Sequence, residues 1–255
     1  MIPFYKHNLK NKNYLKKTIK SYYLTSGPRC IEVEELLKKE FSKKNAYLTN
    51  SWTNAVISIL LALNIKKGDE IIIPACTFVA CANVIEMVGG KVVFADINPD
   101  TKLMDINDCL KKITKKTKVI MPVHLYGNLF QTHLLRKKLR KKIIIIEDSA
   151  HAFCGEYNGK KIGYYSDFLV FSFYATKSIT CGEGGAVLSN NHNMMEKIRS
   201  ISNNGMTKPA FKRFVNNKYI PWDVINFGFK ANLSDVNASL LKDQILKYKK
   251  LCKKK

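Results

Sequence analysis

A lysine at position 177 lies between an apolar run and a glycine-rich turn. Residues 168–173 (FLVFSF) precede it, and residues 182–185 (GEGG) follow it. A lysine held in a pocket can have a lowered pKa and form a Schiff base with a carbonyl group. In a chain this rich in lysine, a single Lys is almost always surface charge. The hydroxyl of Ser172 and the glycines, which permit close backbone approach to a ligand, single out Lys177.

A second polar segment, residues 147–152 (EDSAHA), directly follows the apolar run 143–146. A carboxylate at the end of a buried strand needs a partner, because its desolvation is costly. Asp148 could cap the next helix, which is the common role of an Asp-Ser pair. It could instead pair with a protonated pyridine nitrogen and keep that ring electron-withdrawing. Taken alone, this segment favours the capping role.

Two further segments follow predicted strands or precede predicted helices. Residues 49–55 (TNSWTNA) stand at the expected start of a helix, where free N–H groups and the helix dipole favour an anion. Such a segment more commonly serves only as a helix N-cap. Phe78 follows the apolar run 70–74, and it is either a core residue or a ring that stacks on a flat cofactor.

Together these four segments resemble the DegT/DnrJ/EryC1/StrS family, the sugar aminotransferases that depend on pyridoxal phosphate (PLP) and have the type I fold. The pattern E-D-x-A-H-A, combined with S-F-x-x-x-K-x-I-x-x-G-E-G-G at this separation, is highly specific. The resemblance extends from residue 24 to residue 240. Other family-like stretches are residues 24–28 (LTSGP), 68–70 (GDE), 74–78 (PACTF) and 122–127 (PVHLYG).

The resemblance implies roles for the matching residues. Lys177 would form the internal aldimine with PLP and later move the proton between substrate and cofactor. Asp148 would pair with the pyridine nitrogen. The other cofactor-binding positions are His151 near the ring hydroxyl, Phe78 stacked on the ring, and Ser172 with the backbone of Thr53 and Asn54 at the phosphate. Glu183 would contact substrate or orient Lys177, and Gly27 would lie at the substrate. No metal ion is expected.

The resemblance also implies a homodimer with shared active sites. Residues 228–235 (GFKANLSD) resemble the segment that a partner subunit lends to the active site. Lys230, or alternatively Asn232, would approach the phosphate across the dimer interface. Two positions depart from the family pattern: Trp52 stands where many relatives carry a small residue, and Tyr174 replaces a frequent His.

The elements expected around these residues alternate between strand and helix. Apolar strands without period-2 alternation predict an α/β fold, a three-layer α/β/α sandwich whose mostly parallel sheet is covered on both faces. Ligands then bind beyond the carboxyl ends of the strands, where the polar segments stand. Strands are expected at residues 70–74, 91–96, 117–123, 143–147, 167–174 and 185–189. Helices are expected at residues 30–41, 53–65, 78–88, 105–113, 131–141, 192–202 and 233–251.

The expected organisation has three parts. Residues 1–26 form an N-terminal arm, residues 27–232 the PLP-binding large domain, and residues 233–255 the start of a C-terminal small domain. Family members continue into a small domain that closes over the substrate. We therefore expect a shortened chain, either a truncated product or a fragment completed by another chain.

Composition limits the remaining classes of protein. With 46% hydrophobic residues, the 255-residue chain can bury a core. Its net charge of +23 suggests a nucleic-acid-binding protein. However, the excess of positive charge comes nearly all from Lys rather than Arg, and no set of aromatic and basic residues that could stack on bases accompanies it. Attraction to anionic substrates is a secondary effect of this charge. Seven scattered cysteines suit reduced thiols, and the absence of a signal or membrane-spanning segment favours the cytoplasm.

The leading functional prediction is transfer of an amino group from glutamate to a nucleotide-linked keto-sugar, for amino-sugar and surface polysaccharide biosynthesis. One rival is a PLP-dependent sugar dehydratase, but those relatives replace the Schiff-base lysine with His, and Lys177 argues against it. Another rival is a catalytically impaired family member that binds only PLP or a partner chain. A basic nucleic-acid-binding protein is the third.

Overall fold

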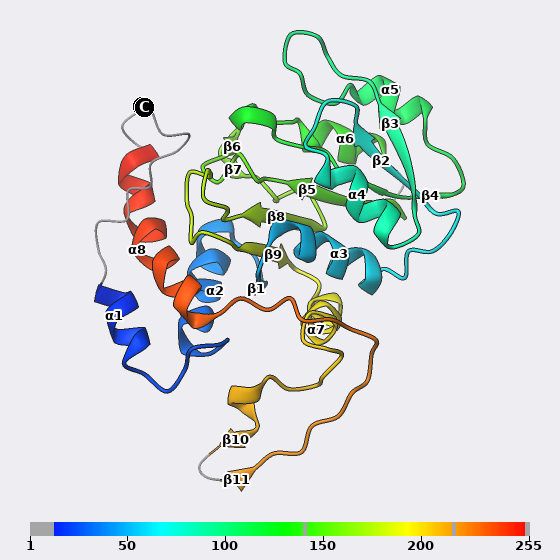
Figure 1. The fold of residues 1–255 in the computed structure, drawn as a ribbon. Helices are drawn as coiled ribbons and strands as arrows, with labels where there is room; N and C mark the ends of the chain where they lie inside the picture. Colours follow the sequence, from blue (N-terminus) through cyan, green and yellow to red (C-terminus); the bar gives the residue numbers. More distant parts are fainter. Residues whose placement is uncertain (1–12, 140–141, 216–217, 253–255) are drawn as a thin grey trace, which may run out of the picture.

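Short runs of branched aliphatic residues form the centre of one seven-stranded sheet in the computed structural model, which describes residues 13–139, 142–215 and 218–252. The strand order is β1-β9-β8-β5-β4-β2-β3 (Figure 1). The strands are β1 (Asn45–Thr49), β2 (Glu70–Pro74), β3 (Lys91–Ala95), β4 (Thr117–Ile120), β5 (Ile144–Asp148), β8 (Phe168–Ser172) and β9 (Gly185–Ser189). Strands β3, β2, β4, β5 and β8 pair in parallel, whereas β9 pairs antiparallel with both β8 and β1. The sheet is therefore mostly parallel, as predicted.

Helices cover both faces of the sheet at β8, because successive residues of that strand pack into different clusters. Phe168 and Val170 join the cluster that contains residues of α3 and α7, whereas Leu169 and Phe171 join the one that contains residues of α2 and α8. This confirms the predicted α/β class with covered faces. The helices are α1 (Asn13–Ile19), α2 (Pro28–Phe41), α3 (Trp52–Ala62), α4 (Ala80–Met87), α5 (Ile106–Lys111), α6 (Thr132–Lys138), α7 (His192–Ile201) and α8 (Asp235–Cys252).

Smaller elements lie in the connections. They are the 3-10 turns η1 (Leu125–Gly127) and η2 (Ala210–Lys212) and the two-stranded pairs β6 (Glu156–Tyr157) with β7 (Lys160–Lys161) and β10 (Phe214–Val215) with β11 (Lys218–Tyr219). Figure 1 shows the segment with β10 and β11 extending away from the sheet. The side chains of α8 pack into the same cluster as those of α2, with Leu241 and Leu37 both fully buried. The division into an arm, a large domain and the start of a small domain stays a prediction.

One cysteine differs from the expectation of reduced thiols. Cys154 is disulfide-bonded, whereas Cys30, Cys76, Cys81 and Cys109 are free thiols, as is Cys181. Among the residues that the structure describes, the helices are too short or too polar to cross a lipid bilayer.

Candidate active site

A cavity of about 550 Å³ lies at the carboxyl ends of the parallel strands. Because β2, β4, β5 and β8 run in the same direction, the segments that follow them meet at one edge of the sheet. These segments supply Phe78, Tyr126, Asp148 and Lys177 to the cavity, and Ser51 comes from the start of α3. Five separate stretches of sequence therefore meet at one site.

Asp148 is the last residue of β5, and its side chain is buried, with 4% exposed. Its Oδ1 accepts a hydrogen bond from the Ala150 N–H (2.9 Å), and its Oδ2 accepts one from the Cys81 thiol (3.5 Å). No helix follows among the described residues 149–155, so the capping role that this segment favours by itself is wrong. Burial raises the pKa of Asp148, and the hydrogen bonds and the nearby His124 and Lys177 oppose that rise.

Lys177 stands in the turn after β8, where its N–H donates to the carbonyl of Tyr174 (3.0 Å). Its side chain is half-buried and lines the cavity, so it is not ordinary surface charge. Burial lowers the pKa of Lys177, and the charge of Asp148 partly opposes this. A larger share of the amine is therefore uncharged and nucleophilic near neutral pH than for an exposed lysine.

His151 is held in one orientation by the strained segment before α6. Its Nδ1 accepts a hydrogen bond from the Tyr126 N–H (3.2 Å), and the two rings stack with centroids 5.7 Å apart. Tyr126 has φ of +53°, a conformation that non-glycine residues rarely adopt. Because Nδ1 accepts, Nε2 of the neutral ring carries the proton. Burial and the charge of Lys177 lower the pKa of His151, which keeps the ring neutral.

The start of α3 lies at one end of the cavity. The N-terminal end of a helix favours an anion. Ser51 caps the helix by accepting from the Asn54 N–H (3.1 Å), and Trp52 and Thr53 line the cavity. The Asn54 N–H is thus engaged within the helix, and this residue does not line the cavity. At Gly185, a Cβ would lie 2.6 Å from backbone atoms of Ser51, so glycine lets β9 pass directly beside the helix start.

Three other predicted site residues also face the cavity. Ser172, at the end of β8, accepts from the Tyr174 N–H (3.4 Å), which leaves its own hydroxyl proton to donate. Phe78 is 71% exposed and lines the cavity, so the core alternative for this residue is wrong. Glu183 lines the same cavity.

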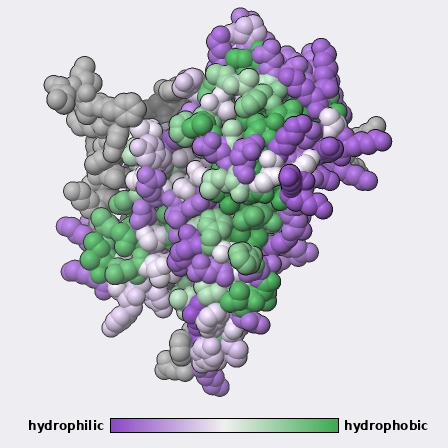
Figure 2. All heavy atoms as spheres, turned by 45° about the vertical axis from the view of Figure 1, so that its right-hand side comes forward, coloured by the Kyte–Doolittle hydropathy of each residue, from purple (hydrophilic) through white to green (hydrophobic). Residues whose placement is uncertain are grey.

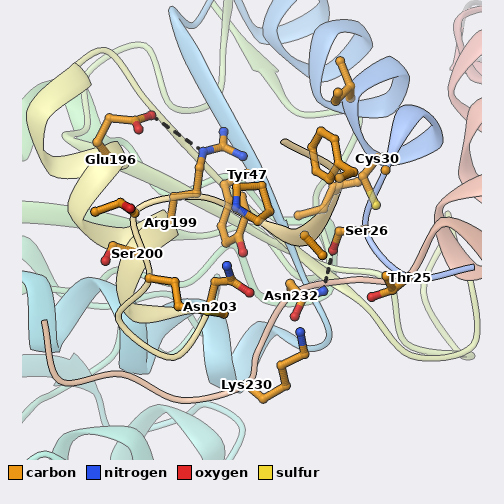
Figure 3. Close-up of a pocket in the computed structure, with 18 of the residues that line it drawn as sticks. Thr25, Ser26, Cys30, Tyr47, Glu196, Arg199, Ser200, Asn203, Lys230 and Asn232 are labelled. Atoms are coloured by element: carbon orange, nitrogen blue, oxygen red, sulfur yellow. Dashed lines mark hydrogen bonds and ion pairs between the residues drawn. The ribbon is translucent and has the colours of Figure 1, made fainter. Parts of the chain in front are cut away.

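Gly27, Lys230 and Asn232 lie elsewhere in the chain, at a second cavity of about 450 Å³. Figure 3 shows Lys230 and Asn232 at this cavity. The Asn232 side chain donates to the Ser26 hydroxyl, and the Gly27 N–H donates to Asp235. The backbone between Lys230 and Asn232 passes next to the start of α3, because the carbonyl of Ala231 accepts from the Asn50 N–H (2.7 Å). Their predicted roles at the phosphate and the substrate remain predictions.

Several cavity residues, among them Cys76, Cys81 and Tyr126, were given no role from the sequence. Tyr126 stands in the family-like stretch PVHLYG, and this resemblance could have indicated that Tyr126 belongs to the site. Cys81 gave none, because it reaches Asp148 from a helix 67 positions earlier in the chain.

Fold and cavity together define an α/β protein in which a lysine, a buried aspartate and a helix start converge on one site. The family model for the DegT/DnrJ/EryC1/StrS aminotransferase family matches residues 6–255. The chain belongs to this family.

Individual relatives agree with this assignment. The chain is 39% identical over 229 residues to the uncharacterised protein MJ1066 of Methanocaldococcus jannaschii, a match that covers 89% of this chain and 59% of that protein. The fold is similar to that of Spr1654 of Streptococcus pneumoniae, described as a sugar aminotransferase and solved in its PMP form (TM-score 0.90, 31% identity, 99% of this chain and 69% of the other). It is also similar to Helicobacter pylori PseC, an aminotransferase of pseudoaminic acid biosynthesis (TM-score 0.83, 29% identity, 96% and 64%).

Proposed function

We propose that this chain binds PLP in the 550 Å³ cavity and transfers an amino group to a nucleotide-linked keto-sugar. The observation that carries the proposal is the convergence of Lys177 and Asp148 on one cavity that starts at a helix N terminus. A sugar as acceptor is supported by Spr1654 and PseC, whose descriptions name sugar or amino-sugar chemistry. Glutamate as donor and a role in surface polysaccharide synthesis extend the proposal beyond these relatives.

The residues present fit PLP. The buried carboxylate of Asp148 has acceptor capacity left after its two hydrogen bonds, and it suits a protonated ring nitrogen. The start of α3 and the Ser172 hydroxyl suit a phosphate. Phe78 and His151 border the part of the cavity between Asp148 and the start of α3. When bound, PLP supplies an electron-withdrawing ring that stabilises negative charge on an adjacent carbon.

The chain's own residues divide the remaining work. The uncharged amine of Lys177 is the nucleophile for an aldehyde, and afterwards it accepts and returns the proton that moves at the substrate carbon. Asp148 would favour a proton on the ring nitrogen, and Nε2–H of His151 would be the donor for a ring hydroxyl. The lysine-rich surface attracts a nucleoside diphosphate, which carries negative charge.

We further propose a homodimer that shares its active sites. The segment that leads to Lys230 exposes three apolar side chains, Val224 (58%), Ile225 (62%) and Phe227 (101%). Apolar patches also interrupt the hydrophilic surface on the face shown in Figure 2. Exposed apolar surface of this kind marks contact with another protein. Packing of this segment on a second copy would carry Lys230 or Asn232 toward the partner's phosphate site.

The first test is covalent. Incubation with PLP should give a visible absorption band, and borohydride reduction should fix the cofactor on the tryptic peptide that contains Lys177. Lys177→Ala should give neither result, whereas Lys43→Ala removes a buried lysine outside the cavity and serves as the matched control. A wild-type protein without band and adduct contradicts the proposal.

The second test is catalytic. With PLP bound, glutamate and a nucleotide-linked keto-sugar should yield 2-oxoglutarate and an amino sugar, both measured by mass spectrometry. Cofactor binding without amino transfer would support the rival function, a family member that binds PLP or a partner chain only.

A further inference from the structure

A chain of hydrogen bonds leads to Asp148 from outside β5. The Thr77 hydroxyl lies 3.2 Å from the Sγ of Cys81, and that Sγ lies 3.5 Å from Oδ2 of Asp148. Cys81 is 1% exposed and Asp148 is 4% exposed, so water screens their contact little. Cys81 lies in the first turn of α4 and Thr77 in the loop before it, and both line the cavity.

The direction of these hydrogen bonds follows from the groups involved. An ionised carboxylate only accepts, so the Cys81 thiol must donate its proton to Asp148. The sulfur is then free to accept from the Thr77 hydroxyl. Burial and the charge of Asp148 both raise the pKa of the Cys81 thiol, so it keeps the proton that it donates.

We propose that Cys81, supported by Thr77, is a positioning residue that orients the Asp148 carboxylate and favours its charged form. This inference rests on the proposed function, since that function gives Asp148 its role toward the ring nitrogen. The thiol occupies one lone pair of Oδ2 and the Ala150 N–H one of Oδ1. The remaining lone pairs are then left for a donor in the cavity.

Other charged or titratable groups also face Asp148. Lys177 approaches from the turn after β8, and His124 approaches from the segment after β4, where its N–H donates to the Asp148 carbonyl (3.0 Å). Both favour the charged carboxylate, against the effect of burial. Loss of the thiol should therefore weaken the charged form without abolishing it.

The test compares PLP affinity at two pH values in Cys81→Ala, Cys81→Ser and Cys109→Ala. Cys109 is a buried cysteine of α5 outside the cavity, which makes it the matched control for lost core volume. We expect Cys81→Ala to weaken PLP binding about fivefold at pH 6 and less at pH 8, because without the donor Asp148 takes up its proton at higher pH. Cys81→Ser should restore the wild-type pH profile. Equal behaviour of Cys81→Ala and Cys109→Ala at both pH values would overturn the inference.

A cofactor-free measurement separates this inference from the proposed function. In the protein without added PLP, the infrared S–H stretching band that disappears in Cys81→Ala belongs to Cys81. Asp148→Asn should move that band to higher frequency, because an amide accepts less strongly than a carboxylate. An unmoved band refutes the contact. A moved band in a protein that never binds PLP would refute the proposed function and leave the hydrogen bond standing.

Discussion

Asp148, the proposed partner of the ring nitrogen, reduces the stability of the folded protein. Its carboxylate is buried at the carboxyl end of β5, and two neutral donors contact it. Burial raises its pKa, which means that the folded protein holds the charge less easily than the unfolded chain does. A bound ring with a protonated nitrogen would remove this disadvantage, so the proposed function would explain why a destabilising carboxylate lies here.

Asp148→Asn should therefore stabilise the protein without PLP. Below the ordinary Asp pKa of about 4, both states are protonated and the substitution should have little effect. As the pH rises toward the raised folded-state pKa, the wild type loses stability and the variant does not. We expect a melting temperature about 2–4 °C above wild type at pH 7, measured by calorimetry. Excess PLP should reverse the order, because only the wild type gains binding energy. A variant less stable than wild type at pH 7 without PLP would contradict this account.

At the scale of elements, α8 completes the N terminus of α2. The N-cap residue Gly27 has no side chain to accept from the first N–H groups of α2. Asp235, at the start of α8, accepts instead from the backbone of Gly27 (2.8 Å), Arg29 (3.0 Å) and Cys30 (2.9 Å). One carboxylate thus caps a helix 205 positions away and joins the two helices.

Removal of this distant cap should cost more than removal of a local one. Asp235→Ala leaves three N–H groups without their acceptor, and we expect a loss of about 2–3 kcal/mol in the free energy of unfolding. Asp105→Ala removes the local cap of α5, whose Oδ1 accepts from Asp108 (2.7 Å), and should cost about 1 kcal/mol. Urea unfolding of both variants measures the difference. Equal losses would show that the distant cap contributes no more to stability than a local cap.

The elements that could be predicted from the sequence are those whose signal is local. The runs EIIIP and IIIIE predicted β2 and β5 because buried parallel strands are apolar on both faces. Strand β1 was missed, since NAYLT is short and mixed and is defined by its antiparallel pairing with β9. The Asp148 motif and Lys177 could be predicted from pattern and resemblance. Contacts such as Cys81 with Asp148 could not, because packing alone creates them.

At the scale of the whole molecule, the position of Lys230 bears on the proposed assembly of the active site from two chains. In this protomer Lys230 lines the second cavity together with Asn203 and Asn232, and it does not line the cavity of Lys177 (Figure 3). The apolar side chains of Val224, Ile225 and Phe227 precede it and are exposed. In the proposed homodimer built on this segment, Lys177 of one protomer and Lys230 of the other would serve the same site.

Mixing two defective variants tests this arrangement. Lys177→Ala lacks the nucleophile, and Lys230→Ala lacks the cation for the phosphate, so each homodimer should bind PLP weakly. A hybrid dimer unites the intact Lys177 of one chain with the intact Lys230 of the other in one of its two sites. After random exchange of subunits, half of the dimers are hybrids, and we expect about a quarter of the wild-type number of tight sites. Titration of the mixture against each variant alone measures this recovery. If Lys230 served its own chain, the hybrid would contain no complete site, and mixing would recover nothing.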